Sequence, residues 1–222
     1  MPPLFYITMI FELFVGLVGI SRFNKMDIPL RYLVGTILFW FVTGTVERVM
    51  GIYGIRNLWL TQCNTLIGLA LFVRIYFLWK TSRIHGLILI YSFSGYVAFW
   101  IISKFTFEPI SGGDDVTSSV SVIFILITTI YLMIQLQKEG PTLWKDDSRF
   151  WTSSAYIIYS VGTFFIFSLF SYMLHVSQET LLFVYPINWI LIIISHLLFL
   201  FAFLCKPASA GIIYQSPTSR SF

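Results

Sequence analysis

The sequence predicts an all-α integral membrane protein built as a bundle of seven transmembrane helices. Hydrophobic residues make up 57% of the 222 residues, charged residues only 11%, and the mean hydropathy is +0.83. A soluble domain carries about 25% charged residues, so a monomer of this composition would expose a large apolar surface in water. The apolar residues gather into seven runs, each close to the roughly 20 residues that a helix needs to cross a bilayer. The lipid bilayer is therefore the expected main partner.

The seven runs follow one another with short polar breaks. Their expected limits are 4–20, 30–53, 57–79, 84–105, 117–137, 150–174 and 181–205. The breaks between them hold turn residues or charges, and the clearest are 27–29, 51–56, 80–83, 108–115, 138–149 and 175–180. We therefore expect a single transmembrane domain over 1–205. The segment 206–222 is rich in Pro, Ser and Gly and is expected to be a disordered cytoplasmic tail.

Basic residues predict the orientation of the bundle. With seven spans, the first, third and fifth loops share one side with the C-terminus, and this side holds ten of the 14 Lys and Arg residues. The opposite side holds three, Arg48, Arg56 and Lys104. Cytoplasmic loops carry the excess of Lys and Arg, so the N-terminus is expected outside and the C-terminus in the cytoplasm. The expected location is the cytoplasmic membrane of a bacterium, as a multi-pass protein.

Two carboxylates lie inside the apolar runs, and they are the strongest functional signal. Glu12 lies on the first run and Glu47 on the second. A carboxylate in hydrocarbon is costly and is usually functional. Glu12 shares a helical face with Gly16 and Gly19, and small residues allow neighbouring helices to approach closely.

Amide side chains on other runs lie at a similar expected depth. They are Gln62 and Asn64 on the third run and Asn188 on the seventh. With the two glutamates, they predict a polar pocket in the outer half of the bundle that binds a cationic or hydroxylated small ligand or exchanges a proton. The alternative is that these side chains only tie helices together, with Glu47 paired to Arg48 or Arg56.

Three further residues are candidate moving parts. Pro186 should kink the seventh helix beside Asn188 and free a carbonyl group, which makes it a candidate hinge. Arg74 lies inside the third run, where it either extends to the cytoplasmic surface or acts as a switch at the inner face. His196 is either a hydrogen-bonded packing residue or a sensor.

Several functional classes lack their motifs. No nucleophile elbow or phosphate-binding loop is present, and no HxxH or HxxxH pair marks a zinc site. A retinal Schiff base would need a lysine in the middle of the seventh helix, and Lys206 lies at its end. The basic residues form no patch of the kind that binds nucleic acid. We expect no enzyme activity, no cofactor and no metal, and the sequence shows no evident internal repeat.

Two segments near the C-terminal half resemble a known family. The first is Phe150-Trp151 followed by Tyr-Ser-Val-Gly-Thr-Phe-Phe at 159–165, and the second runs from Asn188-Trp189 to Phe-Ala-Phe at 201–203. Together with Glu47, they resemble a widespread bacterial group of seven-helix membrane regions that occur alone or as the sensory part of histidine kinases. The resemblance implies a sensory function. The sequence contains no kinase domain, so the signal is expected to pass to a separate partner.

The leading hypothesis is a sensory or receptor-like membrane protein. A ligand or proton would bind among Glu12, Glu47, Asn64 and Asn188, and helix movement would alter the cytoplasmic loops. The loop 138–149 is the largest cytoplasmic surface for a signalling partner, although its aromatic residues also fit an interfacial anchor. The alternatives are a small-solute transporter coupled to protons and a structural subunit of a membrane complex.

Overall fold

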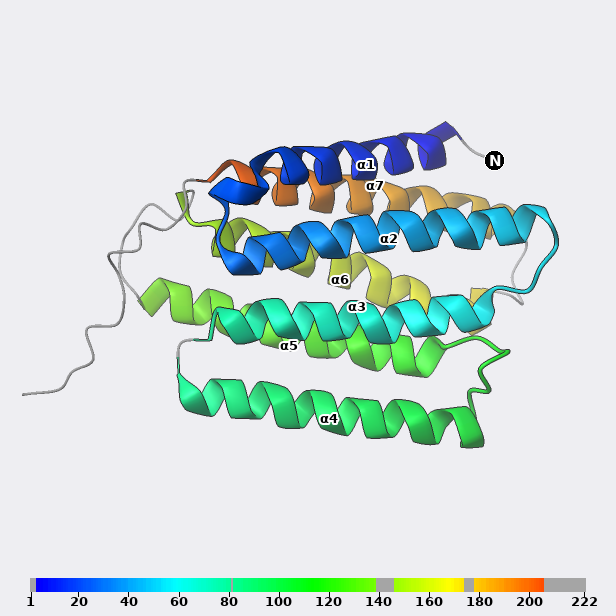
Figure 1. Ribbon diagram of the computed structural model, residues 1–222. Coiled ribbons are helices and arrows are strands. Elements are labelled where there is room, and N and C mark those ends of the chain that lie inside the picture. Colours follow the sequence, from blue (N-terminus) through cyan, green and yellow to red (C-terminus); the bar gives the residue numbers. More distant parts are fainter. Residues whose placement is uncertain (1–2, 81, 139–145, 174–177, 206–222) are drawn as a thin grey trace, which may run out of the picture.

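The computed structural model describes residues 3–80, 82–138, 146–173 and 178–205, and the regular structure in these ranges is helical (Figure 1). The long helices are α1 Pro3–Arg22, α2 Ile28–Ile52, α3 Leu58–Leu78, α4 Arg83–Thr106, α5 Asp115–Lys138, α6 Ser148–Met173 and α7 Gln178–Leu204. A 3₁₀ turn, η1 Phe23–Lys25, follows α1. Counting described residues only, six of the long helices, all except α6, are long and apolar enough to cross a membrane. The chain is therefore a helical, multi-pass membrane protein. The expected tail, 206–222, lies outside the described residues.

Local signals in the sequence set the helix ends. Pro29 lies in the first turn of α2, where its missing N–H removes no helical hydrogen bond. After α2, Gly54 adopts a φ of 68°, and the Ile55 N–H donates to the Met50 carbonyl at 2.9 Å. This arrangement is a Schellman motif, and its left-handed position favours glycine. Ser82 caps α4 with its side chain.

Six helices form a closed ring in which each contacts two neighbours. Their order is α1, α2, α3, α5, α6, α7 and back to α1. Helix α4 lies outside the ring against α3 and α5, at the lower edge of Figure 1. Consecutive helices run in opposite directions, so α1 begins at one end of the bundle and α7 finishes at the other. We call the end with the turn between α1 and α2 the α1–α2 end, and the opposite end the α2–α3 end.

Aromatic side chains fill the middle of the ring. The ring of Tyr156 on α6 lies 4.9 Å from Phe72 and 6.1 Å from Tyr76 on α3, and 5.3 Å from Phe199 on α7, measured between centroids. All four residues are buried. Helix association in lipid depends on such packing rather than on the hydrophobic effect, so this cluster stabilises the contact between α3, α6 and α7.

Glycines bring α1 close to both of its neighbours. A Cβ atom at Gly19 would lie 2.6 Å from a methyl carbon of Val34 on α2 and 3.1 Å from the ring of Phe203 on α7. By contrast, Gly44 and Gly51 on α2 have nothing within 4 Å of such an atom. The small residues of α1 therefore serve close packing, whereas those near the end of α2 do not.

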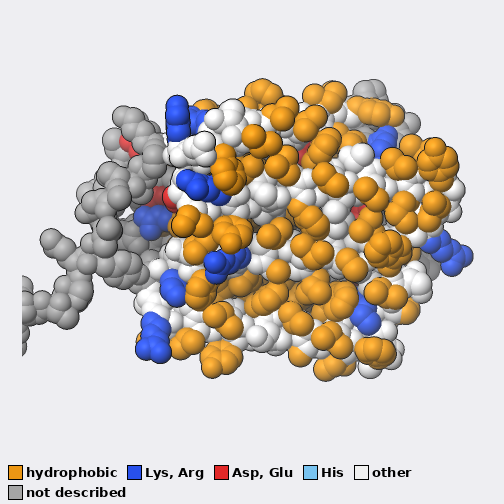
Figure 2. Space-filling model, viewed as in Figure 1, with side chains coloured by type: hydrophobic (Ala, Val, Ile, Leu, Met, Phe, Trp, Pro, Cys, Tyr) orange, Lys and Arg blue, Asp and Glu red, His pale blue; other side chains and the backbone are white. Residues whose placement is uncertain are grey.

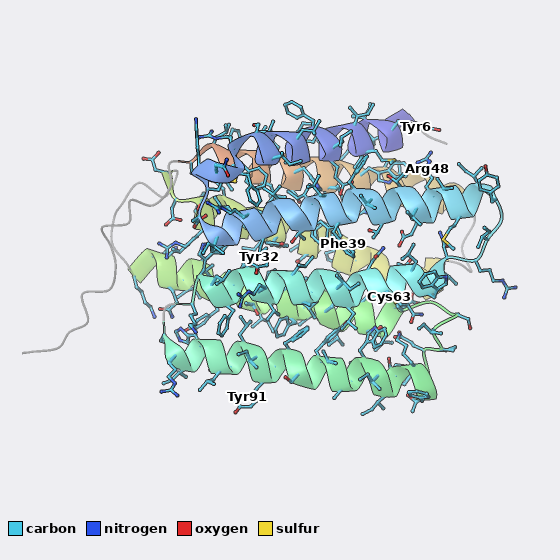
Figure 3. All side chains as sticks on the ribbon, viewed as in Figure 1. Tyr6, Tyr32, Phe39, Arg48, Cys63 and Tyr91 are labelled. Atoms are coloured by element: carbon cyan, nitrogen blue, oxygen red, sulfur yellow. The ribbon has the colours of Figure 1, made fainter. Side chains whose placement is uncertain are left out.

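The outside of the bundle is apolar along most of its length. Large hydrophobic side chains cover the face in Figure 2, and Lys and Arg side chains gather mainly at the α1–α2 end. Tyr91, for example, projects from α4 away from the other helices and is 71% exposed (Figure 3). An apolar exterior around buried polar groups suits a lipid environment.

Candidate intramembrane site

Glu12 on α1 lies against His196 on α7. The distance from Glu12 Oε1 to His196 Nε2 is 3.7 Å, and the two side chains are 15% and 5% exposed. Glu12 is ten residues before the end of α1, which at 1.5 Å per residue places it about 15 Å from that end. The contact is therefore near the middle of the bundle and joins the first helix to the last.

The hydrogen bonding of His196 determines what this contact can hold. Its Nδ1 atom lies 2.8 Å from the carbonyl oxygen of Ile192. A carbonyl oxygen only accepts, so Nδ1 carries a hydrogen. Nε2 then faces Glu12 as an acceptor unless the pair binds one more proton. With that proton the pair is either imidazolium and carboxylate or imidazole and carboxylic acid, and the attraction between α1 and α7 strengthens.

Glu47 on α2 has a different partner. The Asn64 side chain on α3 donates from Nδ2 to Glu47 Oε1 at 2.6 Å, and the Asn57 side chain donates to the backbone carbonyl of Glu47 at 2.7 Å. The Thr61 side chain lies beside the same carboxyl group. We call Glu47, Thr61 and Asn64 the Glu47 site. It lies five residues before the end of α2, near the α2–α3 end.

The Glu47 site has an acidic neighbour and no basic one among the described residues. The charge that acts on Glu47 is that of Asp114, another carboxylate. Arg48, the adjacent residue, is instead turned toward α1, where its guanidinium lies 4.7 Å from the ring centre of Tyr6 (Figure 3). The Oδ1 atom of Asn64 is buried without a hydrogen-bond partner in the part of the chain that is described. The site therefore presents acceptors without a cation.

Tyr159 on α6 connects the two glutamates electrostatically. Both Glu12 and Glu47 act on its hydroxyl group, and its ring stacks on Trp40 of α2 with centroids 5.9 Å apart. The glutamates are not in direct contact with each other. Sequence reasoning did not select Tyr159; its signal is a phenol beside the buried Ser160 in a membrane helix rich in hydroxyl residues.

Gln62 lies on a different side of α3 from the Glu47 site. Its side chain is fully buried, and Nε2 donates to the carbonyl groups of Pro109 at 3.1 Å and Gly112 at 2.8 Å. It therefore holds the loop between α4 and α5 against α3. Thr65, one turn further along, donates to Asp114 of the same loop at 3.1 Å.

Two buried acids of this loop were not selected from the sequence. Glu108 accepts hydrogen bonds from the Val116 N–H at 2.5 Å and from the Thr117 hydroxyl at 2.7 Å, and Lys104 lies 3.6 Å from it. Asp114 accepts from the Ser118 hydroxyl at 2.5 Å. The Glu108 carboxylate satisfies N–H groups in the first turn of α5, which lack helical partners, whereas the Asp114 carboxylate accepts from hydroxyl groups. Their signal is an acid shortly before a Thr-Ser-Ser stretch that opens an apolar run.

The remaining candidate residues lie apart from one another. Helix α7 continues through Pro186 without interruption, and Oδ1 of Asn188 is buried without a hydrogen-bond partner among described residues. Arg74 is exposed, and its guanidinium lies 5.4 Å from the ring centre of Tyr32 on α2. In the loop 138–149, residues 139–145 lie outside the described residues, and Arg149 bonds Asp147 at 2.8 Å.

Within the described ranges, no group of three or more His, Cys, Asp or Glu side chains could hold a metal ion. Comparison of the chain with protein-family models, with curated proteins and with solved structures finds no match. The polar groups that the described part of the bundle buries are carboxyl, imidazole, amide and hydroxyl groups.

Proposed function

We propose that the chain is a receptor-like membrane sensor in which the Glu47 site binds a small cationic ligand or a proton and a separate protein receives the signal. The observation that carries the proposal is a carboxylate in a membrane-spanning helix that has amide and hydroxyl neighbours and on which, within the described residues, the charge of another acid acts and that of no basic group. Such a group is costly in hydrocarbon, and a bound cation or proton would remove the cost.

The proposal includes seven spans, with the N-terminus outside. It draws support from the α1–α2 end, where basic side chains gather in Figure 2. The basic residues at this end include Arg22, Lys25, Arg31, Lys80 and Arg83. Under the positive-inside rule this end is cytoplasmic, and the Glu47 site then lies near the outer surface. In α6, Gly162 closely approaches Leu191 of α7, which fits a helix packed within the bundle.

The proposed relatives are the bacterial seven-helix sensory regions. The two segments that carry the resemblance contact each other, because the ring of Trp151 lies 5.1 Å from that of Phe201. A ligand that binds one arrangement of the bundle more tightly than another would shift the population toward it. Such a shift would change the contacts of α1 with α2 and α7.

The test is a titration of the purified protein in lipid nanodiscs with pH and with tetramethylammonium and choline as probes, followed by tryptophan fluorescence. The response should be lost in Glu47→Gln and weakened in Asn64→Leu. Thr45→Val is the matched control, because that hydroxyl on the same helix bonds only its own backbone, to Phe41 at 2.7 Å. An unchanged response in Glu47→Gln would remove Glu47 from the site.

A second candidate is a small-solute transporter, and the contact pattern of the ring favours it. The contact pattern of α1, α2 and α3 matches that of α5, α6 and α7. The contact of α1 with α2 corresponds to that of α5 with α6, and the contact of α2 with α3 corresponds to that of α6 with α7. The contact of α1 with α7 corresponds to that of α5 with α3. Parallel repeats of this kind occur in transporters, with the substrate between the repeats. Uptake into proteoliposomes driven by a pH gradient would support transport, whereas a sensor would show binding without uptake.

A further inference from the structure

Four hydroxyl groups on one side of α6 are buried without a hydrogen-bond partner among the residues that the structure describes. They belong to Thr152, Tyr156, Ser160 and Thr163, and the first three are at most 1% exposed. These three residues are four positions apart, so they form a column with steps of about 6 Å along the helix. An unpaired buried hydroxyl costs about 1–3 kcal/mol, so the column calls for partners beyond the described side chains.

Other hydroxyl groups in the ring are satisfied by their own helices. Thr36, Thr129 and Ser195 each donate to the carbonyl oxygen four residues earlier, at 2.7–2.9 Å. This local bond is the usual solution for a hydroxyl inside a helix. The hydroxyls of the α6 column do not make it, and a tyrosine hydroxyl at the end of a rigid ring cannot reach its own backbone.

The column leads toward the Glu12–His196 pair. The ring of Phe199 lies 5.3 Å from that of Tyr156 and 5.8 Å from that of His196, so these two side chains flank one phenyl ring. Nε2 of His196, which faces Glu12, is also buried without a hydrogen-bond partner in the described part of the chain. Unpaired polar atoms thus lie on both sides of the Phe199 ring, on α6 and at the pair on α1 and α7.

The other end of the column lies near the α1–α2 end. Ser153, next to Thr152, shares a hydrogen bond with the Tyr76 hydroxyl at 3.2 Å. The ring of Tyr76 lies 5.9 Å from that of Trp79, and Trp79 hydrogen-bonds Asp27 in the turn between α1 and α2. The Oδ1 atom of Asp27 is buried and unpaired within the described residues. Polar groups therefore extend from this turn to the middle of the bundle.

We propose that a file of ordered water molecules fills the column and carries protons between the α1–α2 end and the Glu12–His196 pair. Buried polar groups without a protein partner generally bind ordered water. The water beside Nε2 gives one proton to the pair and regains one from the next water in the file. The net change is one proton taken from the aqueous phase at the α1–α2 end, and the net charge of the pair rises from −1 to 0. The hydrogen on Nδ1 stays on that nitrogen throughout and is donated to the Ile192 carbonyl oxygen.

The titratable groups around the pair come from two neighbouring helices. From α6, Tyr159 faces Glu12, and from α2, Glu47 acts on that same tyrosine. Arg48 of α2 is turned to Tyr6 and Met9 on α1. The proposal does not use the Glu47 site. The proposed orientation adds only that the α1–α2 end, where the protons enter, faces the cytoplasm.

The test is a pH jump applied to one face of proteoliposomes whose protein orientation is fixed. The readout is the infrared band of the Glu12 carboxyl or His196 imidazole group, identified by its loss in Glu12→Gln and His196→Asn. The double variant Tyr156→Phe/Ser160→Ala should slow protonation of the pair about ten-fold or more, equivalent to roughly 1.4 kcal/mol in the barrier. The control Thr36→Val removes a buried hydroxyl that bonds its own helix, at the Tyr32 carbonyl, and should leave the rate unchanged.

The side of the jump provides the second arm. A jump at the α1–α2 end should drive the band, and a jump at the α2–α3 end should not. The proposal is overturned if the double variant behaves like Thr36→Val or if the band follows the α2–α3 face. The band belongs to the pair and not to Glu47, so this outcome is separate from that of the cation titration.

A labelling experiment covers the case in which the double variant does not fold. Cys63 and Cys205, both free thiols, are replaced by Ser, and single cysteines are introduced by Thr152→Cys, Ser160→Cys or Thr36→Cys. Silver ion, a thiol reagent of about the size of water, is added at the α1–α2 end. The first two variants should react and the third should not, whereas equal protection of all three would contradict a hydrated column.

Discussion

Glu12 and Glu108 are both carboxylates in apolar surroundings, but their environments differ. Glu108 accepts hydrogen bonds from the first turn of α5 and lies 3.6 Å from Lys104, all within a short stretch of chain. For Glu12, the polar contact among the described residues is with His196, at 3.7 Å on the last helix. A carboxylate with complete local partners stabilises a loop. A carboxylate with one distant, titratable partner is able to change the packing of two helices when a proton binds.

The largest effect should follow from Glu108→Ala. The change leaves the Lys104 ammonium buried without its carboxylate and removes acceptors from Val116 and Thr117. Breaking a buried pair in this way costs about 3–5 kcal/mol. Thermal or denaturant unfolding in detergent should show the loss. Glu12→Gln should cost much less in the same assay, and equal losses would remove the contrast between the two carboxylates.

A smaller loss should follow from Gly19→Ala. The new methyl group would meet Val34 and Phe203 and push α1 away from α2 and α7, at a cost of about 1–3 kcal/mol for overpacking. The infrared band of the Glu12–His196 pair should shift as well, because the pair spans the same contact. Gly44→Ala is the control: its site is open, and Ala should stabilise the helix by about 0.5–1 kcal/mol. A Gly19→Ala protein as stable as this control would contradict the close approach.

Gln62→Leu tests the side of the bundle that contains Glu108. It removes the donor to the Pro109 and Gly112 carbonyl groups, and a lost hydrogen bond of this kind costs about 0.5–1.5 kcal/mol. Faster amide hydrogen exchange in the loop between α4 and α5 is expected, with the band of the Glu12–His196 pair unchanged. A shift of that band would show that the two regions are coupled.

The smallest effect is expected for Asp27→Asn, and it depends on pH. Burial raises the pKa of the Asp27 carboxyl group above its ordinary value, although hydrogen bonds from Trp79 and the Leu30 backbone lower it. Folding thus favours the protonated form. This stability is fully present below the unfolded pKa of about 3.9 and is lost as the pH rises through the higher folded pKa.

At neutral pH the charged Asp27 therefore costs stability. Asn is as favourable as Asp at the position before a helix, so Asp27→Asn should raise the free energy of unfolding at neutral pH by less than about 1 kcal/mol and change it little at acid pH. Unfolding curves at two pH values measure the difference. A variant that is less stable than the parent at neutral pH would show that the charge is favourable.

The helices were predictable because their signals are local. The seven helices overlap the seven apolar runs, and the ends fall at residues such as Pro29 and Gly54, whose backbone preferences act within one turn. The partners of the polar residues were not predictable in the same way. The sequence places Glu12 and Glu47 at similar depth, but it does not tell which neighbouring helix each one faces. In the ring, Glu12 contacts α7 and Glu47 contacts α3. Gln62, two residues from Asn64, instead bonds the loop between α4 and α5.

Helix α4 has a consequence for the evolution of the chain. It is one helix between two sets of three, and it runs opposite to α3 and α5 (Figure 1). An odd number of connecting helices keeps the second set in the same direction as the first, whereas an even number would invert it. If a three-helix unit were duplicated, the two copies would therefore run in the same direction only with an odd number of helices, such as α4, between them. The place of α4 outside the ring is where an inserted helix of this kind would be accommodated.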